Sequence, residues 1–332
     1  MKIALPSQLR LVTDKALLSG LEADLIQVEE RLAKATSHAE VMVDSMASHL
    51  ARAGGKRLRP VLTLLTSRLG TEGGDKVLDA AVVMEMTHLA TLYHDDVMDQ
   101  ASTRRGVDAA HTVWGNNVAI LTGDLLFARA SNLVSGLGQE ALQLQAQAFE
   151  QLVLGQLHET IGPIDGEDPV GHYIQVLRDK TGSLIAVAAQ LGAMLSGADA
   201  SYQKPLEEFG QSIGVAFQLI DDIIDIESTK SQSGKVSGTD LLAGVPTLPV
   251  LLLAKHTDPA SQQLLKDISS GLDETSLPGV LDRLREHPVM EQAKLETQRW
   301  AEVAIAALAP LPGGKVRTAL EAFASAVVDR KG

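Results

Sequence analysis

Apolar residues recur at spacings of three and four along almost the whole chain of 332 residues. This spacing is typical of helices that bury one face, and no segment shows the alternation of a half-buried strand. The pattern predicts long helices over residues 75–98, 117–134, 139–161, 169–195 and 206–227. Segments rich in Gly, Ser, Pro or Asp separate them, at 70–74, 162–168, 196–201 and 228–238. An all-α fold is therefore predicted.

Neither a low-complexity linker nor a repeat of fixed period divides the chain, so we expect one all-α domain over residues 1–332. The part beyond about residue 257 is expected to serve mainly packing. The net charge of −13 disfavours nucleic acid as a partner. The apolar runs fall short of the roughly 20 residues of a membrane span, and the first ten residues lack a signal-peptide core. We expect a cytoplasmic protein without a membrane span.

Two acidic motifs lie near the ends of two predicted helices: Asp95-Asp96-x-x-Asp99 and Asp221-Asp222-x-x-Asp225. Residues i, i+1 and i+4 of a helix lie within about one turn, so each motif crowds three carboxylates that repel one another. One such motif could be a solvated acidic face. Two copies flanked by apolar residues indicate partial burial, where unpaired carboxylates are costly. Mg²⁺ resolves this conflict, because it binds carboxylate and phosphate oxygens.

Basic residues accompany both acidic motifs, although the chain as a whole is acidic. Each basic segment alone could be an ordinary surface loop. Together they suggest a site for a diphosphate, which Lys and Arg bind through charge-assisted hydrogen bonds. The segments are Gly54-Gly55-Lys56-Arg57-Leu58-Arg59, Arg104-Arg105-Gly106, Lys180-Thr181 and Gly234-Lys235.

These motifs, with Phe217-Gln218 before the second acidic motif, resemble in order and spacing the polyprenyl synthetase (trans-isoprenyl diphosphate synthase) family over about residues 54–249. The resemblance implies the isoprenoid synthase fold, a helical bundle whose acidic motifs face each other across a central active-site cavity, usually in a homodimer. It also implies a Mg²⁺-dependent condensation of isopentenyl diphosphate with allylic diphosphates, giving a longer trans-polyprenyl diphosphate.

The resemblance further implies a role for each matching residue. Asp95, Asp96, Asp99, Asp221, Asp222 and Asp225 would bind Mg²⁺, Asp221 being the most direct ligand of the second motif. Arg104, Lys180 and Lys235 would hold the allylic diphosphate, and Lys56, Arg59, His88 and Arg105 would hold isopentenyl diphosphate. Thr181 and Gln218 would line the reacting carbons. Two departures concern fine specificity: Val245 replaces a common lysine, and Gln156 replaces a common glutamate.

Product length is expected to depend on the residues just before the first acidic motif, where large side chains close the product tunnel in the family. Ala90 and Thr91 are small here, and only two residues separate Asp96 from Asp99. Both features favour a long product of quinone side-chain type. Geranylgeranyl diphosphate is the alternative, because Met84, Met86 or the helix over 117–134 could close the tunnel farther down.

Three other classes of protein fit the sequence less well. A class I terpene cyclase usually steers cations with aromatic faces, and this chain has only 2 Trp, 3 Tyr and 5 Phe. A ferritin-like di-iron bundle needs two Glu-x-x-His segments, whereas only Glu85-x-x-His88 occurs. A non-catalytic regulatory subunit of a prenyl synthase would show degenerate aspartates, and both motifs are intact.

Overall fold

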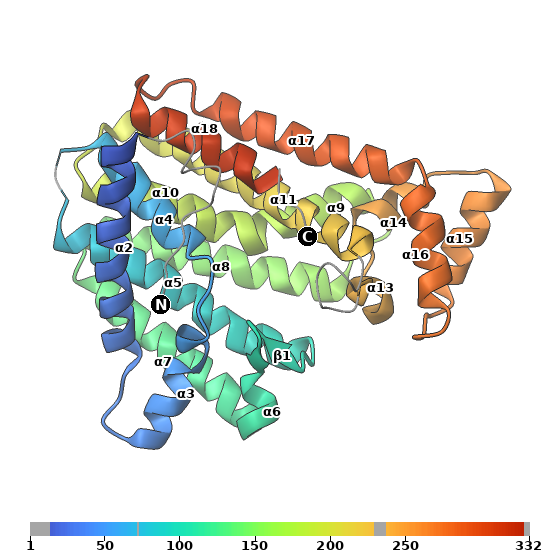
Figure 1. Ribbon diagram of the computed structural model, residues 1–332, viewed down its shortest axis with the longest axis horizontal. Coiled ribbons are helices and arrows are strands. Elements are labelled where there is room, and N and C mark those ends of the chain that lie inside the picture. The colour runs from blue at the N-terminus through green and yellow to red at the C-terminus, as the bar shows by residue number, and fades with distance from the viewer. Residues whose placement is uncertain (1–13, 72, 229–236, 329–332) are drawn as a thin grey trace.

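The computed structural model describes residues 14–71, 73–228 and 237–328, which form a bundle of helices (Figure 1). The first half contains α2 Lys15–Thr36, α3 Val41–Arg52, α4 Leu58–Thr66, α5 Asp75–Met98, α6 Ala110–Trp114, α7 Asn116–Ser135 and α8 Gln139–Ile161. The second half contains α9 Pro169–Leu177, α10 Ser183–Leu195, α11 Gln203–Glu227, α13 Thr239–Ala243, α14 Leu248–Leu253, α15 Pro259–Ser269, α16 Leu277–Glu286, α17 Val289–Ala307 and α18 Lys315–Val328. The prediction of an all-α fold is confirmed.

The predicted helices 75–98 and 139–161 have the observed bounds of α5 and α8. The predicted helix 169–195 needs a correction, because a π-helical turn, Arg178–Gly182, separates α9 from α10. A second correction concerns strands. Thr103–Arg104 (β1) and Val107–Asp108 (β2) form a short antiparallel hairpin. Two-residue strands are too short for a periodic signal. Short 3₁₀ turns at Ser67–Leu69 and Ala200–Tyr202 complete the described elements.

The bundle is organised around α5, α10 and α11. Helix α5 packs against α7, α4, α10 and α2, and α11 packs against α10 and α17. Side chains such as Leu62, Met86 and Phe209 are fully buried between them. Glycine lets α11 approach the π-helical turn closely, because a Cβ at Gly214 would lie 2.5 Å from the Cα of Gly182. This close approach brings the residues of the π-helical turn next to α11.

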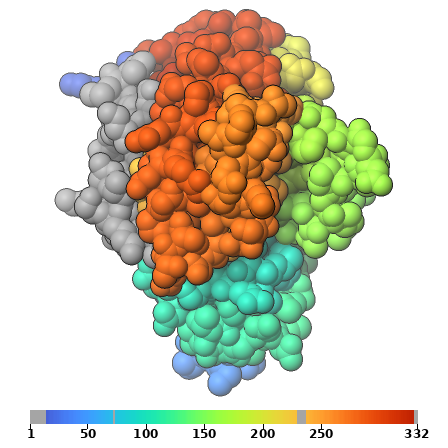
Figure 2. All heavy atoms as spheres, turned by 90° about the vertical axis from the view of Figure 1, so that its right-hand side faces the viewer, coloured from blue at the N-terminus to red at the C-terminus, as the bar shows by residue number. Residues whose placement is uncertain are grey.

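The C-terminal helices lie on the outside of this arrangement. Helices α17 and α18 run along one side of the bundle, and α15 and α16 project at one end (Figure 1). Figure 2 turns that end toward the viewer, and the orange part of the chain, which includes α15 and α16, fills the middle of the face. Their placement agrees with a mainly structural role for the chain beyond residue 257.

One helix among the described residues, α7, is long and apolar enough to cross a membrane by length and composition alone. One third of its apolar window is buried inside the protein. The expectation that the apolar segments are too short for a membrane span therefore does not hold for α7 when only length and composition are considered.

Candidate active site

The two acidic motifs occupy the C-terminal ends of α5 and α11. Asp95 and Asp96 lie in the last turn of α5, Asp99 is its C-cap, and Asp225 lies in the last turn of α11. Both motifs lie near Asp240 in the first turn of α13. Burial raises the pKa of Asp240 to about 6, and nearby carboxylates add to the rise: Asp225, Asp99, Glu159 and Asp221. The structure thus brings the ends of the two motifs near the same residue, Asp240.

The surroundings of the first motif disfavour the ionised form of its three carboxylates. Burial raises the pKa of Asp95 to about 6, and burial also raises the pKa values of Asp96 and Asp99. Asp96 is completely buried, and its Oδ1 accepts a hydrogen bond of 2.5 Å from Arg104 Nε. Its other carboxylate oxygen, Oδ2, is buried without a protein partner. An added cation would relieve the desolvation and the repulsion at once.

Two aspartates of the second motif contact different elements of the protein. Asp222 is buried and accepts a hydrogen bond from the hydroxyl of Tyr173 on α9. The Asp225 carboxylate accepts from the Thr239 hydroxyl (3.0 Å) and from the Asp240 amide (3.2 Å), which anchors the start of α13. Asp222 and Asp225 therefore have protein partners on α9 and α13, which hold the end of α11 in place.

Sequence reasoning missed two acidic residues of this cluster. Asp240 lies outside the repeated motifs, in a helix of five residues that carries no periodic signal. Glu159 of α8 forms an ion pair with Lys180 and lies near Asp95, Asp99 and Asp240. Neither residue could be found by spacing, because helix packing brings them to the cluster from distant parts of the chain.

The oxygen-rich cluster suits Mg²⁺, although the protein alone does not complete a cation site. Among the described residues, no three carboxylate or histidine side chains are grouped so as to hold a metal ion by themselves. Mg²⁺ commonly binds one or two carboxylates and takes its other ligands from phosphate and water. The partnerless Asp96 Oδ2 and the raised pKa values of the first motif fit an ion that arrives together with a diphosphate.

A second part of the site is rich in guanidinium groups. Burial lowers the pKa of His88 well below its usual value, and Arg59, Arg105, Arg104 and Arg57 lower it further. A neutral His88 among four arginines can donate or accept a hydrogen bond without adding charge. Arg59 Nε is buried without a protein partner, and burial lowers the pKa of Arg59 to about 10. An anionic ligand would satisfy both groups.

The remaining predicted residues that the structure describes are Thr181, Gln218, Lys56 and Lys180. The Thr181 hydroxyl donates to Gln218 Oε1 at 3.5 Å, which links the π-helical turn to α11. Lys56 Nζ lies 5.8 Å from the centre of the Phe217 ring. Lys180, predicted to hold the allylic diphosphate, is paired with Glu159. Lys235 lies outside the described residues.

The residues predicted to set product length are buried one turn below the first motif. Ala90 and Thr91 are at most 6% exposed, and the Thr91 hydroxyl donates to the His88 carbonyl at 2.8 Å. Met84 and Met86 are completely buried farther down α5. Thr87 lies on α5 between Met86 and Ala90, and its hydroxyl oxygen is buried without a hydrogen-bond partner.

Comparison with known proteins agrees with this geometry. The polyprenyl synthetase family model matches residues 40–283. The chain is 43% identical to nonaprenyl diphosphate synthase of Mycobacterium tuberculosis over 96% of both chains. It is 34% identical to octaprenyl diphosphate synthase of Escherichia coli over 87% of this chain and 90% of that protein. A crystal structure of geranylgeranyl pyrophosphate synthase from Corynebacterium glutamicum, complexed with calcium and isoprenyl diphosphate, superposes with a TM-score of 0.85 at 43% identity, covering 96% of this chain and 98% of that chain.

The chain belongs to the polyprenyl synthetase family. Within this family it is a trans-isoprenyl diphosphate synthase with the all-α isoprenoid synthase fold. The resemblance noted in the sequence is confirmed.

Proposed function

We propose that this enzyme uses Mg²⁺ to extend an allylic diphosphate repeatedly with isopentenyl diphosphate, giving a long trans-polyprenyl diphosphate of quinone side-chain type. The observation that supports this most directly is the pairing of two unlike charge clusters. Carboxylates with raised pKa values converge on Asp240, and arginines surround a neutral His88. Such a pair of clusters suits two diphosphates, one bound through metal and one bound by guanidinium groups.

The reaction follows from this division. Mg²⁺ held by Asp95, Asp99 and Asp221 would act as a Lewis acid toward the allylic diphosphate. Lys180 and Arg104 stabilise the negative charge that develops as the allylic C–O bond breaks. The double bond of isopentenyl diphosphate, held by Lys56, Arg59, His88 and Arg105, attacks the allylic cation and forms the new C–C bond. A proton then leaves to the released diphosphate, which restores an allylic double bond.

The proposed product length rests on the buried residues below Asp95. Ala90 and Thr91 are buried and have small side chains, which would leave room for a growing chain. The relatives include nonaprenyl and octaprenyl diphosphate synthases. A geranylgeranyl product is the second candidate, because Met84 and Met86 fill the space farther down α5 and the Corynebacterium glutamicum enzyme is equally similar.

We also propose that the enzyme is a homodimer whose interface includes α7 and α8. Apolar side chains on these two helices are exposed in the single chain, as expected for a face that a second copy covers. Those at least 40% exposed are Ile120 and Leu121 of α7 and Val153, Leu154, Leu157 and Ile161 of α8. A partner would also account for the apolar composition of α7 in a cytoplasmic protein.

Product sizing tests the proposed function. Purified protein is incubated with labelled isopentenyl diphosphate, farnesyl diphosphate and Mg²⁺, and the dephosphorylated products are separated by length. We expect linear chains well beyond twenty carbons, no product in the presence of a chelator, and recovery when Mg²⁺ is restored. A twenty-carbon end product would select the geranylgeranyl alternative. A cyclic hydrocarbon, or no product, would refute the proposal.

A further inference from the structure

Arg57 is an arginine of the Gly54–Arg59 segment that cannot serve as a substrate ligand. It is only 3% exposed at the N-cap of α4. Its Nε and Nη2 donate to the Glu29 carboxylate, and Nη2 also donates to the Ala51 carbonyl at 3.0 Å. Its Nη1 donates to Glu85 Oε1 at 2.7 Å and to the Gly54 carbonyl at 3.2 Å. A guanidinium group has five N–H donors, so all of them are used inside the protein.

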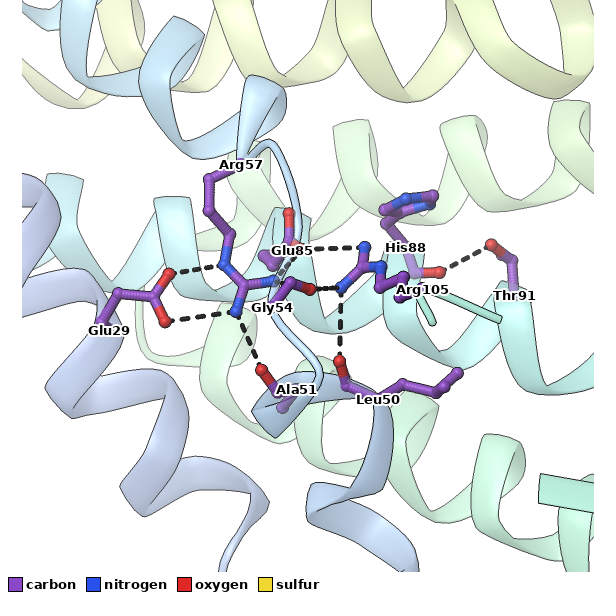
Figure 3. A network of polar contacts seen from close by, with 9 residues as sticks. All are labelled: Glu29, Leu50, Ala51, Gly54, Arg57, Glu85, His88, Thr91 and Arg105. Atoms are coloured by element: carbon purple, nitrogen blue, oxygen red, sulfur yellow. Dashed lines mark hydrogen bonds and ion pairs between the residues drawn. The ribbon is translucent and has the colours of Figure 1, made fainter. Parts of the chain in front are cut away.

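Glu85 links Arg57 to an arginine on another element. It is 1% exposed on α5, and its Oε1 accepts from Arg57 Nη1 and from Arg105 Nη2, the latter at 3.4 Å. Arg105, in the turn between β1 and β2, also donates through Nη1 to the Gly54 carbonyl. Figure 3 shows Glu29, Arg57, Glu85 and Arg105 in sequence across the loop. Three separate segments are thereby fixed relative to α5.

Both arginines hold an unfavourable backbone conformation. Arg57 has φ 51° and Arg105 has φ 54°, and among the described residues the only other non-glycine with positive φ is Gln100. The Arg105 guanidinium group packs closely on the loop, because a Cβ at Gly55 would lie 2.8 Å from it. Backbone strain of this kind persists only where the surrounding contacts enforce it. The ion-paired network supplies those contacts.

We propose that Glu29 and Glu85 are positioning residues for the second substrate. Through Arg57 they hold the Gly54–Arg59 loop and Arg105 in the arrangement that binds the diphosphate of isopentenyl diphosphate. Glu29 lies on α2, outside residues 40–283 that the family model matches. Helix α2 is therefore part of the machinery that shapes this binding site. The inference rests on the proposed function, specifically on the assignment of Lys56, Arg59 and Arg105 to isopentenyl diphosphate.

Simple electrostatics and positioning predict opposite effects of removing a carboxylate. Glu29→Gln makes the neighbourhood less negative, so electrostatics alone would strengthen the binding of an anion. If Glu29 positions the loop, the same change releases Arg57 and weakens binding, since preorganised donors no longer face the ligand. The sign of the change in KM for isopentenyl diphosphate therefore separates the two explanations.

The experiment measures KM for both substrates and kcat in Glu29→Gln. We expect KM for isopentenyl diphosphate to rise roughly tenfold, the size expected for loss of a charge-assisted contact, while KM for the allylic substrate changes less than about twofold. The control is Arg31→Gln, which breaks the ion pairs of α2 with Asp75 and Asp79 of α5 without touching the loop. This variant should leave both KM values unchanged. Thermal unfolding followed by circular dichroism checks that both variants are folded.

A second variant keeps the test decisive if Glu29→Gln folds poorly. Arg57→Lys retains one positive charge and loses the planar fork, so it should raise the same KM. An unchanged or lowered KM for isopentenyl diphosphate in folded Glu29→Gln or Arg57→Lys, or an equal rise for both substrates, overturns the inference. Arg105→Ala separates this result from failure of the proposed function. If Arg105→Ala leaves KM for isopentenyl diphosphate unchanged, the assignment of the site is wrong. If it raises that KM while the two other variants have no effect, only the positioning role is wrong.

Discussion

Replacing Asp95 with asparagine should stabilise the metal-free protein while removing most of its activity. Burial raises the pKa of the Asp95 carboxyl group from 3.8 to about 6, and Asp99 adds to the rise, although Lys180 and Arg104 oppose it. At neutral pH the folded protein must therefore carry an ionised carboxylate that its surroundings disfavour. Asparagine has nearly the same shape and no charge, so the substitution removes this cost together with a proposed metal ligand.

The magnitude follows from the difference between the folded and unfolded pKa values. About two pH units correspond to about 3 kcal/mol at a pH above both values. Asp95 keeps partial contact with solvent and asparagine also needs hydrogen-bond partners, so we expect a gain of about 1–2 kcal/mol in the free energy of unfolding, or a rise in Tm of roughly 2–5 °C.

The expected pH dependence has a definite sign. Because the folded-state pKa lies above the unfolded value, the folded protein binds more protons between about pH 4 and 6. The free energy of unfolding of the wild-type protein therefore falls as the pH rises through this window. The advantage of Asp95→Asn should be small at pH 4, grow up to about pH 6 and stay constant above it.

The assay is urea unfolding followed by circular dichroism in the presence of a chelator, between pH 4 and 8. Asp273→Asn serves as a comparison, because we expect it to change the stability in the opposite direction. Hydrogen bonds from Thr275 and Ser276 lower the pKa of Asp273, so this variant should lose stability relative to the wild-type protein at neutral pH. A lower stability of Asp95→Asn than of the wild-type protein at pH 8, or an equal gain in stability at pH 4 and pH 8, would contradict a raised pKa of Asp95 in the folded protein.

Three further predictions concern other parts of the protein. Ala90→Phe should shorten the main product by several isoprene units without abolishing turnover, and an unchanged product distribution would contradict the proposed tunnel. Leu157→Glu should convert the dimer to monomers in sedimentation experiments, because it places a charge in the proposed α7–α8 interface; a dimer that persists would locate the interface elsewhere. Asp240→Asn should lower turnover at least roughly tenfold at a fixed Mg²⁺ concentration, with partial recovery at higher Mg²⁺, and full activity would remove Asp240 from the metal-binding cluster.

The fold could be predicted from the sequence because helix periodicity is a local property. The bounds of α5 and α8 follow directly from spacing, and both acidic motifs fall on the expected helix ends. The π-helical turn Arg178–Gly182 could not be predicted, since it leaves the apolar spacing on either side intact. Apolar spacing therefore predicts where a helix begins and ends, whereas it does not reveal a π-helical turn inside a continuous apolar pattern.

The parts of the site that were missed depend on contacts between distant segments. Arg57 meets Glu29 and Glu85, each 28 positions away, and Tyr173 meets Asp222 across 49 positions. No spacing rule connects such pairs, because helix packing alone decides which side chains meet. The sequence therefore indicated the residues expected to contact substrate, and gave no sign of those that hold them in place.

The proposed role of Lys180 in binding the allylic diphosphate gives its ion pair with Glu159 a consequence for substrate selection. In the free enzyme the lysine already has a counter-ion, so a ligand that uses Lys180 has to displace a carboxylate. A diphosphate carries enough charge to compete, whereas the corresponding monophosphate or alcohol offers less or none. Binding at this position is then an exchange of one anion for another. Dephosphorylated chains, which share the hydrocarbon tail of the substrate, would be rejected at entry.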